Sequence, residues 1–271
     1  MKQQKLFATT VIALFFLSLT GSTQAQDEQV FFMVDYMKVT EGMNTEYLAG
    51  EQGVWKSIHE THVKKGVHHG WSLYQIVVPG GSEREYDYVT VTRFVGEKAV
   101  AEFMSGAWYD EAAKTLTDKE KEEMMMTGKA RKRVRSELSQ FQGGVFGQAE
   151  QSLPRYLVVN YIKLKEGISS DQYRTVENEI WKPMHEARIK DGHMRGWFMT
   201  SLQLPFGSSM PYECGTVDQF DNLEDMMTAN LPAYFAKTHP DKDVQKAFQR
   251  TSDARDIVKG DIWELIDYVQ Q

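Results

Sequence analysis

The stretch YLAGEQGVWKSIHETHVKKGVHHGW, residues 47–71, recurs without a gap as YRTVENEIWKPMHEARIKDGHMRGW at residues 173–197. Ten of the 25 positions are identical, and the second copy follows the first at an offset of 126 residues. Self-similarity of this kind indicates two copies of one structural unit. The repeat therefore constrains the fold strongly and the chemistry much less.

The repeat extends beyond this stretch on both sides. Upstream, YMKVTEG at residues 36–42 matches YIKLKEG at residues 161–167. Downstream, AKTLTDK at residues 113–119 matches AKTHPDK at residues 236–242. Each unit thus spans roughly 110 residues, which is an ordinary size for one small domain.

The first 25 residues have the pattern of a secretory signal peptide. Two lysines precede an apolar run, Leu6–Leu19, and the small residues of Thr23-Gln24-Ala25 suit a cleavage site. The run is shorter than the ~20 residues that span a bilayer, and no second apolar run follows it. We expect a mature chain that begins near Gln26, has no integral membrane segment, and is periplasmic or secreted.

Composition excludes some classes of function. The chain carries a formal net charge of −7, which becomes −9 without the two lysines of the signal peptide. An acidic chain with only one short basic cluster, at residues 129–135, argues against a nucleic-acid partner, because phosphate contacts need clustered lysine or arginine. Cys214 is the only cysteine, so an intramolecular disulfide is excluded, and we expect a buried, inert thiol.

Both units show the same order of hydrophobic patterns: strand, helix, strand, strand, helix, strand. The strands are expected at residues 30–39, 67–78, 87–95 and 134–141, and again at 156–164, 194–204, 213–220 and 258–268. The first helices are expected at residues 44–65 and 169–191, ending at Gly66 and Gly192. Residues 143–154, rich in glycine and glutamine, are expected to form a linker.

This element order is the split βαβ, or ferredoxin-like, plan of an α+β protein. With its duplication, the chain resembles the dimeric α/β-barrel superfamily, which includes monooxygenase-like, EthD-like and NIPSNAP-like proteins and several haem-dependent enzymes. The resemblance implies that two tandem βαββαβ repeats, residues 26–142 and 155–271, form an intramolecular dimeric α/β barrel. No active-site motif of a named branch is present, so the resemblance implies no catalytic residue and identifies no cofactor.

The strongest functional candidate is a stripe of side chains on the first helix of each unit. Glu51, Trp55 and His59 are spaced four residues apart, which places them on one helix face. The second unit repeats the stripe with Glu177, Trp181 and His185. A histidine oriented by a carboxylate can act as a general base, and a neighbouring tryptophan can stack on a ligand. Alternatively, the same residues anchor the helix to its sheet.

Two details bear on this choice. Pro183 lies inside the second helix, where the first unit has Ser57, and a proline there is expected to kink the helix. If the protein is an enzyme, we expect one stripe to line a cavity, and His185→Ala to abolish turnover without lowering the melting temperature. If it is a scaffold, we expect both stripes to be buried against their sheets.

Other chemistries have weaker support. His59, His62, His68 and His69 are close in sequence, but His59-Glu60-Thr61-His62 is one residue short of the zinc-protease spacing, so no metal site is predicted. A haem pocket remains an alternative, although the haem-attachment motif Cys-x-x-Cys-His is missing from the sequence. Arg131 and Arg255 recur before the last strands and either bind a ligand carboxylate in the barrel or pair with acidic residues.

The sequence thus predicts an exported α/β barrel that binds a small, partly apolar molecule. As an enzyme it would use a His/Glu pair for proton transfer or oxygenation, with the tryptophans and the two arginines binding the substrate. The alternative is a non-catalytic ligand-binding or scaffold protein. The sequence predicts a pseudo-dimer within one chain and leaves further oligomerisation open in either direction.

Overall fold

The computed structural model describes residues 29–271, except residue 82 and residues 148–151. The expected signal peptide lies outside the described residues. The first unit contains β1 (Val30–Val39), α1 (Asn44–Gly50), η1 (Glu51–Trp55), α2 (Lys56–Lys64), β2 (Gly70–Val78), β3 (Tyr88–Val95), α3 (Glu97–Met104), α4 (Ala107–Thr115), α5 (Asp118–Ala130) and β4 (Arg131–Phe146).

The second unit repeats this order. It contains β5 (Tyr156–Leu164), α6 (Ser170–Val176), η2 (Glu177–Trp181), α7 (Lys182–Lys190), β6 (Gly196–Leu204), β7 (Cys214–Phe220), α8 (Leu223–Met227), α9 (Leu231–Thr238), α10 (Val244–Ala254) and β8 (Arg255–Gln270). The expected pair of βαββαβ units is therefore confirmed.

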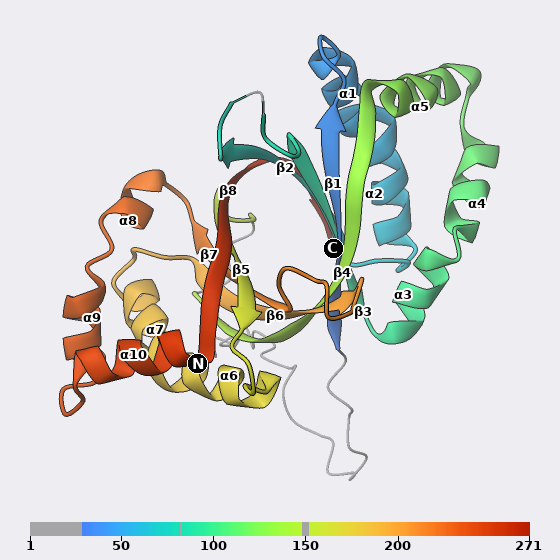
Figure 1. The fold of residues 1–271 in the computed structure, drawn as a ribbon. Helices are drawn as coiled ribbons and strands as arrows, with labels where there is room; N and C mark the ends of the chain where they lie inside the picture. The colour runs from blue at the N-terminus through green and yellow to red at the C-terminus, as the bar shows by residue number, and fades with distance from the viewer. Residues whose placement is uncertain (1–28, 82, 148–151) are drawn as a thin grey trace, which may run out of the picture.

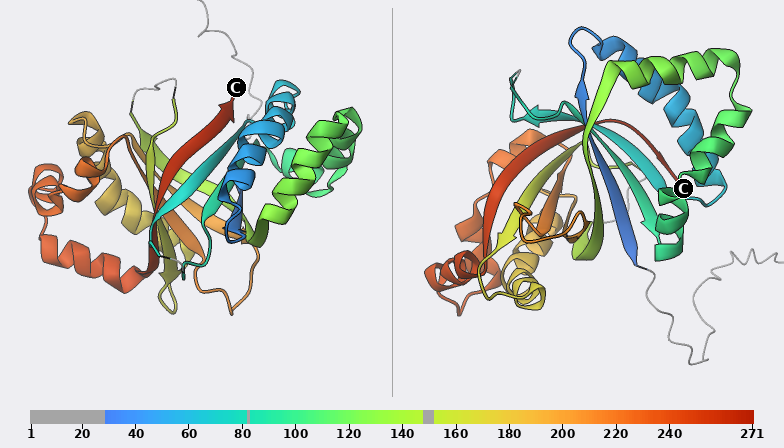
Figure 2. Two further views of the ribbon diagram at one scale, coloured as in Figure 1. Left: turned by 90° about the horizontal axis from the view of Figure 1, so that it is seen from above. Right: turned by 45° about the vertical axis from the view of Figure 1, so that its right-hand side comes forward.

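The strands of both units close one barrel. In the described part of the chain its order is β1-β3-β2-β8-β5-β7-β6-β4, and neighbouring strands are antiparallel. Figure 1 looks into this ring, with the helices of each unit on its outside. The two further views place α1–α5 and α6–α10 on separate sides of the ring (Figure 2). The predicted intramolecular dimeric α/β barrel is what the chain forms.

Strand alternation separates the interior of the barrel from the layer beneath the helices. In β1, Val34 and Tyr36 belong to a core cluster that contains side chains of both units. The neighbouring Met37 instead packs with Tyr47 of α1, on the helix side of the sheet. Because successive side chains of a strand point to opposite faces, every strand contributes to both layers.

The fourth strand of each unit is longer than the sequence predicts, because it pairs with both units. Its first part, up to Gln140, pairs with β1, and its last part pairs with β6 of the other unit, up to Phe146 opposite Gly196. Residues 143–146, expected in the linker, thus belong to β4. β8 makes the equivalent crossing from β5 to β2.

The first long helix of each unit is not a regular α-helix. A π-helical stretch interrupts it in both units, at Glu51–Trp55 and at Glu177–Trp181. Pro183 was expected to kink the helix of the second unit alone. The first unit has Ser57 at this position and the same π-helical stretch, so the irregularity does not distinguish the two units. Pro183 is the second residue of α7, which continues directly from η2, so its missing backbone N–H falls within a continuous helical run.

Candidate functional site

The barrel encloses a cavity of about 390 Å³. Most of its wall is apolar and comes from inward-facing side chains of both units, including Phe32, Val34, Val159, Phe198, Leu202 and Trp263. One end reaches strand termini such as Val30 of β1 and Phe146 of β4. The other end reaches a group of polar side chains, most of them buried, so the cavity has an apolar wall and a polar floor.

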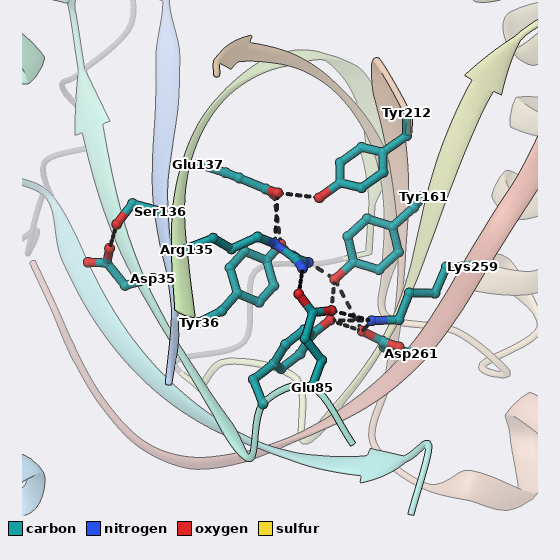
Figure 3. Close-up of polar contacts among 11 residues, drawn as sticks. Asp35, Tyr36, Glu85, Arg135, Ser136, Glu137, Tyr161, Tyr212, Lys259 and Asp261 are labelled. Atoms are coloured by element: carbon teal, nitrogen blue, oxygen red, sulfur yellow. Dashed lines mark hydrogen bonds and ion pairs between the residues drawn. The ribbon is translucent and has the colours of Figure 1, made fainter. Parts of the chain in front are cut away.

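We call this group the polar layer, and Figure 3 shows it inside the barrel. It consists of Tyr36, Glu85, Tyr86, Arg135, Glu137, Tyr161, Tyr212, Lys259 and Asp261. The layer follows the internal repeat, because Tyr36, Tyr86, Arg135 and Glu137 of the first unit correspond to Tyr161, Tyr212, Lys259 and Asp261 of the second. The duplication thus placed two related sets of polar residues in one barrel.

Two carboxylates of this layer, Glu137 and Asp261, each accept hydrogen bonds from tyrosines of both units. Glu137 accepts from the hydroxyl of Tyr36 at 2.9 Å and from Tyr212 of the other unit. Asp261 accepts from Tyr161 at 3.2 Å and from Tyr86 of the other unit. Each of these two carboxylates is therefore hydrogen-bonded by a tyrosine of the other unit.

The two sets are joined through their hydroxyl groups. The hydroxyls of Tyr36 and Tyr161 lie 3.4 Å apart, and those of Tyr161 and Tyr86 lie 3.1 Å apart. Lys259 Nζ donates to the hydroxyl of Tyr86 at 2.9 Å. The result is one continuous network across the barrel.

Burial and neighbouring acids keep the tyrosines in their phenol form. Burial, followed by the charge of Glu137, holds the pKa of Tyr36 well above its usual range. The pKa values of Tyr161, Tyr86 and Tyr212 are raised as well, in each case mainly by burial. The hydroxyls consequently remain donors to the two carboxylates at neutral pH.

The two sets differ in their charged neighbours. The Arg135 guanidinium lies 3.0 Å from Glu137 and 3.9 Å from the ring centroid of Tyr36. The equivalent position beside Asp261 holds Lys259, at 3.4 Å. Glu85 contacts both cations, whereas the second unit has Pro211 at the position of Glu85. The polar layer is therefore symmetric in its tyrosines and acids and asymmetric in its ion pairs.

The stripe residues predicted from sequence lie elsewhere, between the helices and the sheet. Glu51 forms an ion pair with Arg131 at 2.7 Å, and the guanidinium of Arg131 lies 5.4 Å from the ring centroid of Trp55. Burial raises the pKa of Glu51 to about 7, against the opposing charge of Arg131. Arg131 is thus the partner of the stripe, and none of these residues belongs to the described wall of the cavity.

The second unit repeats this arrangement. The guanidinium of Arg255 donates to Glu177 at 2.9 Å and lies 5.7 Å from the ring centroid of Trp181. Burial raises the pKa of Glu177, which is 1% exposed. The structure therefore brings the predicted glutamates, tryptophans and arginines together as two equivalent Glu–Arg–Trp clusters.

The two stripe histidines are buried and stack on tryptophans of the sheet. His59 stacks on Trp71 with ring centroids 5.0 Å apart, and its Nδ1 lies 3.1 Å from Nε2 of His68. His185 stacks on Trp197 at the same centroid distance, and burial lowers its pKa to about 3. The expected pairing of each histidine with its glutamate is not what forms, because the glutamates face the arginines. Both stripes are buried in the same way.

Metal binding gains no support from the described residues. No group of three or more histidine, cysteine, aspartate or glutamate side chains among them is arranged to hold a metal ion. None of the helices in the described residues combines the length and the apolar composition that a membrane span requires.

Comparison with known proteins gives the fold. No protein-family profile matches the sequence, and no curated protein sequence matches it either. Among solved structures, a candidate monooxygenase from Lactobacillus acidophilus is similar, with a TM-score of 0.51 and 12% identity over 90% of this chain and 97% of that one. A variant of the chlorite dismutase from Candidatus Nitrospira defluvii has a TM-score of 0.50 and 10% identity over 88% and 91% of the two chains.

A haem-binding protein from Thermus thermophilus is similar to the same degree, with a TM-score of 0.50 and 7% identity over 89% of this chain and 92% of that one. Identities this low establish a shared dimeric α/β-barrel fold and leave the function open.

The wall of this barrel does not fit haem. Its described residues include no histidine or methionine, which are common axial ligands. Burial raises the pKa of the Cys214 thiol to about 12 and holds that of Tyr36 well above its usual range, so both side chains are neutral at neutral pH in the metal-free barrel. His59 and His185 are enclosed by stacked rings on the helix side of the sheet.

Proposed function

We propose that this protein binds a small, mainly apolar molecule in the barrel cavity, with one hydrogen-donating group against Glu137. The observation that carries this proposal is the apolar cavity of about 390 Å³ that ends on a buried carboxylate. Ligand pockets usually have volumes of about 300–1,000 Å³ and combine an apolar wall with a few polar groups. The signal-like pattern of residues 1–25 supports a site of action outside the cytoplasm.

The contacts of Glu137 indicate which polar group the ligand carries. Oε1 accepts a hydrogen bond from Tyr212 and lies 3.0 Å from Arg135 Nε in an ion pair, and Oε2 accepts a hydrogen bond from Tyr36. An ionised carboxylate has about four lone-pair sites, so one acceptor position at Oε2 is left for an O–H or N–H of the ligand. A ligand carboxylate would meet a like charge there, so a phenol, enol or amide fits the floor better.

Binding can be tested with 4-nitrophenol, a small aromatic molecule with one acidic hydroxyl. We expect saturable binding at acidic pH, where the probe is neutral, and its loss in Val217→Trp, which fills the cavity from its wall. Val134→Trp is the matched control, because Val134 lies on the exposed face of β4. Equal binding by both variants, or no binding by the wild type, would contradict the proposal.

One observation favours a catalytic role over binding alone. Glu137 is only 4% exposed and faces the cavity, so it can take a proton from the ligand without competition from bulk water. Proton abstraction is also the first step needed for oxygenation of a phenol or enol by molecular oxygen. Deuterium exchange at an enolisable carbon of a bound ketone would reveal this activity, and unchanged exchange in Glu137→Gln would refute it.

A further inference from the structure

We propose that the polar layer is a proton relay, which carries a proton from the ligand cavity through Glu137, Tyr36, Tyr161 and Asp261 to solvent at Lys259. The inference rests on the proposed function, because the acidic hydrogen of the bound molecule supplies the proton. Figure 3 shows these side chains directed toward one another in the barrel.

The relay needs groups that both give and accept a proton at hydrogen-bond distance. Tyr36 lies 2.9 Å from Glu137, Tyr161 lies 3.4 Å from Tyr36, and Asp261 lies 3.2 Å from Tyr161. A tyrosine hydroxyl is both donor and acceptor, and its hydrogen rotates to suit its neighbours. Two hydroxyls therefore connect two carboxylates without a gap that requires water.

A relay is required because a ligand closes the direct route. Glu137, Tyr36 and Tyr161 line the cavity, so an apolar molecule bound there displaces the water in front of them. Asp261, on the far side of the network, is 0% exposed. A proton taken up by Glu137 consequently leaves through the layer or waits until the ligand dissociates.

The direction of transfer follows from the difference between Arg135 and Lys259. Arginine keeps its proton at any physiological pH, so Arg135 fixes the charge beside Glu137 and provides no exit. Lysine exchanges its protons with water, and the side chain of Lys259 is 33% exposed. Asp261 Oδ1 has no hydrogen-bond partner among the described residues, so it offers a free acceptor next to that exit.

Each step conserves protons and charge. Glu137 takes the proton of the ligand, which becomes an anion, and then gives a proton to the oxygen of Tyr36. In the structure Tyr36 donates to Glu137 and Tyr161 donates to Tyr36, so this transfer requires the Tyr36 hydrogen to rotate toward Tyr161 and the Tyr161 hydrogen to rotate toward Asp261. Tyr36 then passes its own hydrogen to Tyr161, and Tyr161 passes its hydrogen to Asp261. Lys259 releases one proton to solvent as it takes one from Asp261, which returns to a carboxylate. The other charged or titratable groups facing this path are Glu85, Tyr86, Arg135 and Tyr212.

The test follows the ionisation of bound 4-nitrophenol after a rapid jump from acidic to mildly alkaline pH, using the absorbance of its phenolate. In the wild type we expect ionisation to be faster than dissociation of the probe, which a displacement experiment measures separately. Tyr161→Phe and Lys259→Arg should each slow ionisation at least about tenfold, a barrier increase of about 1.4 kcal/mol. Lys259 is not among the residues that line the cavity, so Lys259→Arg should keep the Kd at acidic pH within about twofold.

Tyr88→Phe is the matched control, because it removes a buried tyrosine hydroxyl that bonds to Asn44 outside the polar layer. It should ionise the probe at the wild-type rate. Wild-type rates in Tyr161→Phe and Lys259→Arg, or wild-type ionisation no faster than dissociation, would overturn the relay and leave ligand binding standing. Failure of the wild type to bind the probe would instead overturn the proposed function, and the relay with it.

Discussion

Replacing Arg255 by methionine should destabilise the protein strongly, because it leaves the carboxylate of Glu177 buried without its partner. The pair is separated by 2.9 Å, and the side chains of Arg255 and Glu177 are 11% and 1% exposed. Removing one member of a buried ion pair costs about 3–5 kcal/mol. Loss of the contact with the Trp181 ring adds about 0.5–1 kcal/mol. For a chain of this size we expect the melting temperature to fall by roughly 10 °C.

The assay is urea denaturation of the wild type, Arg255→Met, and the double variant Glu177→Gln with Arg255→Met. The double variant should recover most of the lost stability, because no buried charge remains. The loss in Arg255→Met should also grow as pH rises, since the unfolded carboxylate ionises while the buried one resists ionisation. If Arg255→Met lowers the free energy of unfolding by less than about 1 kcal/mol, the pair contributes no more than an exposed ion pair does. The conclusion that the buried Glu177–Arg255 pair stabilises the fold would then be wrong. Equal losses in the single and double variants would refute it as well.

Three further outcomes are expected. Burial lowers the pKa of His68 from 6.5 to about 4. The stability that the neutral buried imidazole contributes is therefore complete above pH 6.5 and is lost as pH falls toward 4, by about 3 kcal/mol. His68→Gln should flatten this part of the curve of unfolding free energy against pH. Glu137→Gln should weaken binding of neutral 4-nitrophenol about tenfold in a titration, or about 1.4 kcal/mol; unchanged affinity would place the hydroxyl elsewhere. Gly144→Ala should lower the melting temperature, because a Cβ there overlaps the carbonyl of Trp197 across β4 and β6. Gly128→Ala is its control, since a Cβ there meets open space and should stabilise α5 by about 0.5–1 kcal/mol.

The architecture could be predicted from the sequence because duplication and strand patterning are local signals. The order of elements and the glycines that end the first helices, Gly66 and Gly192, appear as expected. The lengths of β4 and β8 could not be predicted, because their last residues pair only with the other unit. Pairing between units is a property of the closed barrel.

The candidate site was harder to predict. A regular spacing of four residues suggested that Glu51 supports His59, but a π-helical stretch begins at Glu51 and the carboxylate meets Arg131, 80 residues later in the chain. Two signals for the polar layer were present, since Tyr36 and Tyr86 recur as Tyr161 and Tyr212. Tyr36 and Tyr161 lie on strands, whereas Tyr86 and Tyr212 precede β3 and β7, and which of these side chains meet inside is decided only when the barrel closes.

The crossing of β4 and β8 between units has a consequence for how this protein can vary. β4 pairs with β6 and β8 pairs with β2, so each unit contributes one strand to the sheet of the other. The pairing of these strands, and not the backbone connection between the units, holds the barrel together. We therefore expect a chain cut between the units to remain one particle, and new termini to be tolerated there. A symmetric pair of separate subunits would have to carry every substitution twice. Covalent continuity removes that restriction, so an arginine and a lysine can occupy equivalent places in a single barrel.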